Sequence, residues 1–147
     1  MQSKDYHIER FYREHRLNYE TALKEIKNGR KQSHWIWYIF PQLKILGSSA
    51  KSELYGIENA EEARIYYNDA YLGEKFREIC QALIDCGSDN ALEIMGYPDN
   101  LKLCSSMTLF YIATGDELFG RVLDKFYSGK TDGRTVSFLQ MLGQGNY

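Results

Sequence analysis

Cationic, amide and hydroxyl side chains stand directly before a run of large rings in residues 29–42, GRKQSHWIWYIFPQ. This combination suits the binding of an anionic ligand. A helix that begins at Ser33 would present free backbone N–H groups and a positive dipole end, and Lys31 would add charge. The rings of Trp35 and Trp37 are of the type that stacks on a base or a sugar. The candidate ligand-binding residues of this stretch are Lys31, Ser33, His34, Trp35, Trp37 and Gln42.

The same stretch also fits the interior of a small domain. Large aromatic side chains contribute much of the buried area in a protein core. A histidine such as His34 acts either as an acid or base, or only as a hydrogen-bonding group within the core. The sequence leaves both interpretations open.

A second stretch, residues 99–108 (DNLKLCSSMT), combines a lysine with two serines. Lys102, Ser105 and Ser106 are three and four residues apart, so we expect them to share one helix face, opposite the apolar residues of that helix. Such a face either holds a phosphate or carboxylate, or hydrogen-bonds a neighbouring helix. Arg134 is a third candidate for anion binding, because its guanidinium fork matches a carboxylate or phosphate.

Known catalytic and metal-binding signatures are absent from the sequence. It contains no GxSxG, Walker A or HExxH motif, and no GxGxxG after a strand. No general base stands beside Ser105 or Ser106, so no catalytic residue is assigned. His7 and His15 are two helical turns apart, ~12 Å along the axis, which is too far to share one metal ion. We therefore expect no metal and no cofactor, and the sequence does not decide whether the protein is an enzyme.

Helical periodicity runs through the chain and predicts the elements that position these residues. The spacing predicts a helix over residues 6–16 and a second one, capped by Asn18, over 18–28, which would form an antiparallel pair. Further helices are predicted from Ser48 or Ser49 to 55, at 59–70, 72–85, 91–95, 98–114 and 116–128, and from Thr131 or Asp132 to 142.

Residues 34–40 fit either a buried strand or a short buried helix, because they hold four aromatic residues and two isoleucines. Ser33 is a good helix cap and Pro41 a good helix stop. A strand here would have no partner, since the chain contains no second convincing β pattern. We therefore predict a helix, and an all-α single domain of about eight short helices in a wrapped, non-bundle topology.

Composition limits the classes of protein to which the chain can belong. Its 147 residues are 44% hydrophobic, which fits one domain over residues 1–147 with a frayed tail at 143–147. A formal charge of −2 is too balanced for dedicated nucleic-acid binding. No apolar run is long enough to span a membrane, and three cysteines without a CxxC pair indicate reduced thiols. We expect a cytoplasmic protein.

Charge is distributed unevenly along the chain. Residues 1–31 hold eight Lys/Arg against five Asp/Glu, a charge of +3, whereas residues 53–93 hold three against ten, a charge of −7. The two segments could orient a charged partner, attract each other across one domain, or form solvated helix faces.

Both candidate stretches, with SSAKSELYGIENAEEARIYYND and LGEKFREICQAL, closely resemble the bacterial family catalogued as domain of unknown function 1810. The resemblance covers nearly the whole chain and implies an all-helical single-domain fold, but it implies no reaction. Some members carry a calpastatin label, although no part of this chain resembles a disordered calpain-inhibitor repeat. The residues that match signature positions of the family are Lys31, Ser33, His34, Trp35, Trp37, Gln42, Lys102, Ser105 and Ser106.

Two functions remain at this stage. In the first, the candidate residues form one concave pocket that binds a small anionic or nucleotide-like molecule. In the second, the protein is a non-catalytic interaction module that uses an aromatic groove and its charged segments to hold a protein partner, whose identity the sequence does not give.

Overall fold

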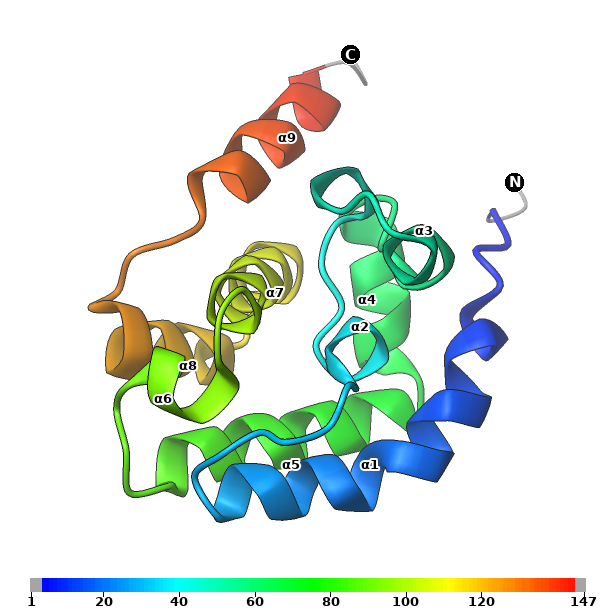
Figure 1. Cartoon of the computed structure of the whole chain (residues 1–147). Coiled ribbons are helices and arrows are strands. Elements are labelled where there is room, and N and C mark those ends of the chain that lie inside the picture. The colour runs from blue at the N-terminus through cyan, green and yellow to red at the C-terminus, as the bar shows by residue number, and fades with distance from the viewer. Residues whose placement is uncertain (1–3, 145–147) are drawn as a thin grey trace.

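Residues 4–144, which the computed structural model describes, form helices and loops, so the predicted all-α class is confirmed (Figure 1). An isolated bridge joins Leu43 to Ile57, and no strand is present in this range. The elements, in chain order, are η1 (Ile8–Phe11), α1 (Tyr12–Lys27), α2 (Ile36–Ile39), η2 (Lys44–Leu46), α3 (Ala50–Tyr55), α4 (Ala60–Asn68), α5 (Leu72–Asp85), α6 (Ala91–Met95), α7 (Asp99–Thr114), α8 (Glu117–Tyr127) and α9 (Gly133–Gln144), where η marks a 3₁₀ helix.

The N-terminal region differs from the prediction, because the expected antiparallel pair at 6–16 and 18–28 is one continuous helix, α1, preceded by η1. Asn18 does not cap a helix; its side-chain amide donates to the carbonyl oxygen of Glu14, one turn earlier. The buried stripe of α1 continues without interruption from His15 through Tyr19 to Ile26. This continuous buried face keeps α1 as one helix against the body.

α1 and α5 lie side by side and run in the same direction (Figure 1). Tyr12 of α1 contacts Asp69, and the His15 Nδ1 lies 2.9 Å from the Tyr71 hydroxyl. Further along, the Tyr19 hydroxyl donates to Glu78 of α5 over 2.6 Å. Residue numbers therefore increase together along both helices.

α7 is the central helix of the molecule. Helices α2, α4, α6, α8 and α9 all pack against it, and Figure 1 shows it nearly end-on among its neighbours. Its buried residues lie on several faces rather than on one stripe. A helix covered on most sides is apolar around most of its circumference, and that is the environment of Ser105 and Ser106.

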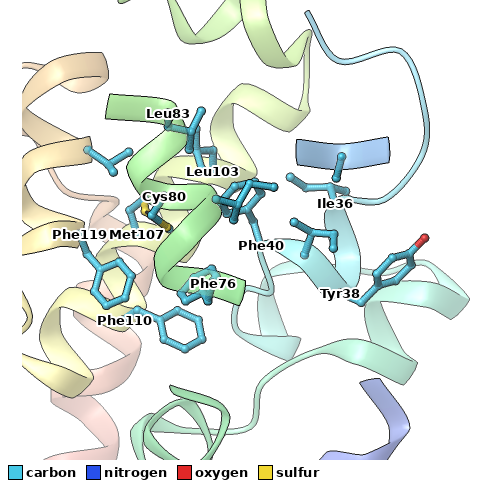
Figure 2. Packing of buried hydrophobic residues seen from close by; sticks show 14 of the residues in the cluster. Ile36, Tyr38, Phe40, Phe76, Cys80, Leu83, Leu103, Met107, Phe110 and Phe119 are labelled. Atoms are coloured by element: carbon cyan, nitrogen blue, oxygen red, sulfur yellow. The ribbon is translucent and has the colours of Figure 1, made fainter. Parts of the chain in front are cut away.

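Aromatic rings from different helices form the centre of the core. The ring centroids of Phe76 (α5) and Phe110 (α7) are 4.5 Å apart, and Phe119 (α8) lies 5.3 Å from Phe76 (Figure 2). Phe40, which follows α2, reaches the same cluster 6.0 Å from Phe76. This contact attaches α2, which carries Trp37, to the core.

Several predicted helix starts are confirmed. The Ser49 hydroxyl accepts from the Ser52 N–H at the start of α3, and the Asn59 side chain accepts from the Glu62 N–H at the start of α4. Asp116 likewise accepts from an N–H in the first turn of α8. Each cap satisfies a backbone donor that the helix itself cannot satisfy.

The predicted helix at 34–40 is present but shorter, because α2 spans only Ile36–Ile39. Ser33 does not begin it, so the predicted cap is wrong: Trp35 occupies the N-cap position, and no side chain caps the helix. Pro41 stands directly after the residue that ends α2, as predicted.

α9 extends further than predicted. Asp132 accepts from the Thr135 N–H and so begins the helix as expected. The helix runs to Gln144, so residues 143 and 144 belong to it rather than to a frayed tail, while the remainder of the predicted tail, 145–147, lies outside the described residues. Within residues 4–144, no helix has both the length and the apolar character to cross a bilayer.

Candidate functional site

A pocket opens where α2, α3 and α7 meet. It is shallow, with only ≈ 10 Å³ of enclosed space for a water-sized sphere, and it brings together three of the sequence candidates, Trp37, Gln42 and Lys102. Lys51 and Ser52, from the first turn of α3, complete its polar lining. Its apolar lining is formed by Ile36, Phe40, Leu43 and Tyr55, with Gly56 beside them. We call this space the Trp37 pocket.

Two ammonium groups lie close to the ring of Trp37. The Lys51 ammonium lies 4.5 Å from the centroid of its ring, and the Lys102 ammonium lies 5.6 Å from it. The indole Nε1–H is buried and has no hydrogen-bond acceptor in the part of the chain that the structure describes. A buried donor without an acceptor costs free energy, about 1–3 kcal/mol, so it marks a place where an acceptor is missing.

The charge of the Trp37 pocket is positive. No carboxylate is among the described residues that line it. Lys51 is exposed and makes no ion pair within 4–144, and the Lys102 ammonium has only a distant carboxylate, 3.8 Å away on Asp99. Two ammonium groups at an apolar wall attract an anion more strongly than the same groups in open water.

Lys31 lies behind the Trp37 pocket rather than in it. Its side chain is buried, its ammonium pairs with Asp99 over 2.9 Å, and it donates to the carbonyl oxygen of Ser33. Because the same Asp99 carboxylate also faces Lys102, it connects the buried lysine to the lysine that lines the pocket. Lys31 is thus fully occupied by internal partners.

The carboxylate of Glu25, in α1, fills the anion site predicted at Ser33. It accepts hydrogen bonds from the Ser33 hydroxyl, the Ser33 N–H, the Gln32 N–H and the Trp35 indole N–H, at 2.6–3.0 Å. Burial acts to raise the pKa of Glu25, but these hydrogen bonds together outweigh it and hold the pKa below its ordinary value. The anion bound there is the protein's own.

Trp35 is therefore a structural residue in this fold. Its side chain is buried, with Phe40 6.0 Å away on one side and the Lys31 ammonium 4.9 Å from the ring centroid. A ligand would have to open the core to stack on it. Of the two tryptophans, Trp37 alone lines the pocket.

Ser105 and Ser106 do not form a polar face with Lys102, which corrects that prediction. Both are buried in α7, and the Ser105 hydroxyl donates to the Leu101 carbonyl oxygen of its own helix. The Ser106 hydroxyl is buried without a partner among the residues described. Neither serine lines the Trp37 pocket. The expected apolar face opposite them is not distinct, because α7 is buried on several sides.

His34 and Arg134 lie away from the Trp37 pocket. His34 is exposed, and its backbone carbonyl oxygen accepts from the Tyr38 hydroxyl at 3.4 Å. Arg134 is an exposed residue of α9 and lines a different concave surface. Three of the sequence candidates thus line the pocket, His34 and Arg134 lie elsewhere on the surface, and the others are buried or partly buried in the fold.

His7 lies near two carboxylates at the N-terminal end of the described chain. The His7 ring Nδ1 lies 3.5 Å from Asp5 and 3.4 Å from Glu9, and all three side chains are exposed. These contacts form a weak surface ion-pair group.

Residues 5–139 match the family model described as protein of unknown function (DUF1810). The chain belongs to this family. It is similar to a solved structure, a conserved hypothetical protein, Rv1873, from Mycobacterium tuberculosis, with 41% identity and a TM-score of 0.88. The match covers 90% of this chain and 96% of the mycobacterial one. No curated protein matches the chain.

The DUF1810 relationship supports the fold and gives no activity. Sequence reasoning missed Lys51 and Ser52 in the Trp37 pocket, and Glu25 and Asp99 in the support behind it. Lys51 and Ser52 stand in SSAKSELYG, one of the segments that carried the family resemblance, and that was the only signal for them. Glu25 looked like an ordinary polar residue of an amphipathic helix.

Proposed function

We propose that this DUF1810 protein binds a small anionic or nucleotide-like molecule at the mouth of the Trp37 pocket. One observation carries the proposal: two lysines and no carboxylate of the described chain surround an indole whose buried N–H has no acceptor. An anion with oxygen atoms would supply that acceptor and neutralise both ammonium groups.

The size of the pocket limits the ligand. Sites for drug-sized ligands enclose about 300–1,000 Å³, whereas the Trp37 pocket encloses only ≈ 10 Å³ of space for a water-sized sphere, which is about the room that one water molecule needs. The body of the ligand must therefore lie at the mouth of the pocket, and only an oxygen atom of its phosphate or carboxylate group enters the enclosed space. Lys51 is exposed and unpaired within 4–144, so its flexible side chain is able to move from the ring of Trp37 to the ligand.

The lining favours binding over acid–base catalysis. No histidine or carboxylate of residues 4–144 lines the pocket, and the Ser52 hydroxyl already accepts a hydrogen bond from Ser49 over 2.9 Å. We therefore infer a binding role, in the cytoplasm, the compartment that free cysteines favour.

A thermal-shift screen tests the proposal. The purified protein is heated with inorganic phosphate, AMP, ADP, sugar phosphates and small carboxylates, each over a range of concentrations. A ligand that binds the folded state adds about 2.7 kcal/mol at a hundredfold excess over its Kd. We expect a saturating rise in Tm with at least one phosphate compound.

Lysine variants locate the binding. Lys51→Ala and Lys102→Ala should each weaken binding by about 10- to 100-fold, the equivalent of one charge-assisted hydrogen bond. Lys27→Ala, which removes an exposed lysine of α1, is the matched control and should bind as the wild type does. If no compound stabilises the protein, or if Lys27→Ala loses as much as the pocket variants, the proposal is wrong.

A further inference from the structure

A second concave surface lies between η2 and α9, and its volume is ≈ 410 Å³. We call it the α9 groove. Its η2 wall is formed by Ile45 and Leu46, and its α9 wall by Gly133, Arg134, Ser137, Phe138 and Met141. Figure 1 shows α9 along the edge of the molecule, next to α7 and facing the region of α3.

The side chains of the α9 wall change from charged to apolar along the helix. Arg134, Ser137, Phe138 and Met141 are spaced at i, i+3, i+4 and i+7, so they form one continuous stripe along α9. The stripe begins with a cation and continues with apolar side chains over ~10 Å, given the rise of an α-helix. A ligand that matches it carries a negative charge at one end of an apolar face.

Exposure of the walls distinguishes a small ligand from a protein segment. Ile45 and Met141 remain 59% and 58% exposed. Pockets for small molecules bury most of the ligand's surface, and walls as exposed as these do not. A folded segment with its own apolar surface would cover both residues, in the manner of an amphipathic helix in a groove.

Charge complementarity defines the segment further. Arg134 makes no ion pair within residues 4–144, and no carboxylate of that range lines the groove. An acidic side chain that packs there would pair with a guanidinium that is free of competitors.

We propose that the α9 groove binds an amphipathic helix of a partner protein, with apolar residues at i, i+3 or i+4, and i+7, and an acidic residue next to that stripe. The apolar side chains cover Ile45, Phe138 and Met141, and the acidic residue pairs with Arg134. This function is independent of the Trp37 pocket, because the two sites share no lining residue.

Peptide selection tests the proposal without a known partner. A phage library of 16-residue peptides is selected on the wild-type protein, with counter-selection on Ile45→Asp. We expect enriched peptides with the stated apolar spacing and an Asp or Glu beside it. A synthetic peptide of the enriched sequence is then titrated by fluorescence anisotropy.

Substitutions in the α9 groove should weaken peptide binding, and a substitution outside it should not. Ile45→Asp, Met141→Asp and Arg134→Glu should each weaken binding by tenfold or more, and because all three positions are exposed the variants should fold. Reversing the acidic residue of the peptide to Lys should restore binding to Arg134→Glu. Ile112→Asp changes an apolar residue that is 47% exposed outside the groove and should leave binding unchanged.

Several results would overturn the proposal. One is the absence of enriched peptides with the wild-type protein, and another is binding that Arg134→Glu and Ile45→Asp leave intact. A third is a concentration-dependent dimer in sedimentation that Ile45→Asp abolishes, since the groove would then be occupied by a second copy of this chain.

Discussion

The carboxylate of Glu25 organises the loop that leads to the Trp37 pocket. It receives four hydrogen bonds, from residues 32, 33 and 35. Such a concentration of donors on one charged group fixes the path of the loop between α1 and α2. The position of Trp37 thus depends on a residue twelve positions earlier that does not line the pocket.

Glu25→Ala should destabilise the fold by about 2–3 kcal/mol, because it leaves several partly buried donors without an acceptor. Urea unfolding measures the change, and Glu20→Ala, an exposed carboxylate of the same helix, serves as its matched control. Equal effects of the two substitutions would show that the hydrogen bonds to Glu25 contribute nothing specific.

His15 makes the stability of the protein depend on pH. Burial, with the nearby positive charges of Lys75 and Arg16, lowers its pKa to about 4, against the opposing effect of Asp69. The ring is stacked on Tyr19 and lies 2.9 Å from the Tyr71 hydroxyl. The folded state therefore holds this histidine neutral.

The sign of the effect follows from linkage. A histidine whose pKa is lower in the folded state binds its proton first in the unfolded chain, so stability is complete above pH ~6.5 and declines as the pH falls toward 4. The wild type should lose about 3 kcal/mol of unfolding free energy between pH 7 and pH 4 through this group. His15→Gln, measured by urea unfolding at each pH, should lack this loss, and a variant with the same pH slope as the wild type would contradict it.

At the scale of the elements, carbonyl groups at the C-terminal end of α5 accept hydrogen bonds from a lysine of another helix. The Lys125 ammonium, in α8, donates to the carbonyl oxygens of Leu83, Ile84 and Cys86 at 2.7–2.8 Å. A cation at this end of a helix satisfies carbonyl groups that have no partner within the helix and complements its dipole. The contact joins α5 to α8 beside the aromatic core.

Lys125→Met keeps most of the apolar stem and removes the charge, so it should cost about 1–3 kcal/mol. Lys130→Met, at an exposed position in the next loop, is the control and should be neutral. Thermal unfolding gives both values. A neutral Lys125→Met would show that water satisfies these carbonyl groups equally well.

The sequence predicted some helix starts correctly and others wrongly, because distant groups compete for some of the capping side chains. The Asn59 Oδ1 accepts from the free N–H of Glu62 and so caps α4, while the Nδ2 of the same side chain donates to the Tyr6 hydroxyl and leaves the oxygen available. Ser33 is an equally good cap by type, but a carboxylate from α1 competes for its hydroxyl and wins with a charged hydrogen bond. Local patterns predict caps only where no distant charged group competes for the side chain.

Taken as a whole, the molecule uses its uneven charge internally. Arg10, from the positive segment, pairs over 2.7 Å with the buried carboxylate of Glu62, and Lys4 pairs with Glu58 over 2.6 Å. Both acids belong to the negative segment. Of the three interpretations of the charge pattern, these contacts favour attraction between two parts of one domain.

The all-α class followed from periodicity and caps, whereas the composition of the candidate site did not. Trp37, Gln42 and Lys102 meet because α2 and α7 pack together, and this long-range contact leaves no trace in local spacing. The two serines beside Lys102 were assigned to a polar face because sequence does not show that α7 is covered on several sides.

The indole N–H signals of the two tryptophans test the central claim most directly. In a ¹H–¹⁵N correlation spectrum, the protein is titrated with inorganic phosphate, AMP and ADP. Trp35 already donates to Glu25, whereas the Trp37 N–H has no acceptor within residues 4–144. We predict a saturable shift of the Trp37 signal with at least one of these compounds, little change at Trp35, and loss of the shift in Lys51→Ala. If neither signal moves, or if Lys51→Ala retains the shift, the Trp37 pocket is not an anion site.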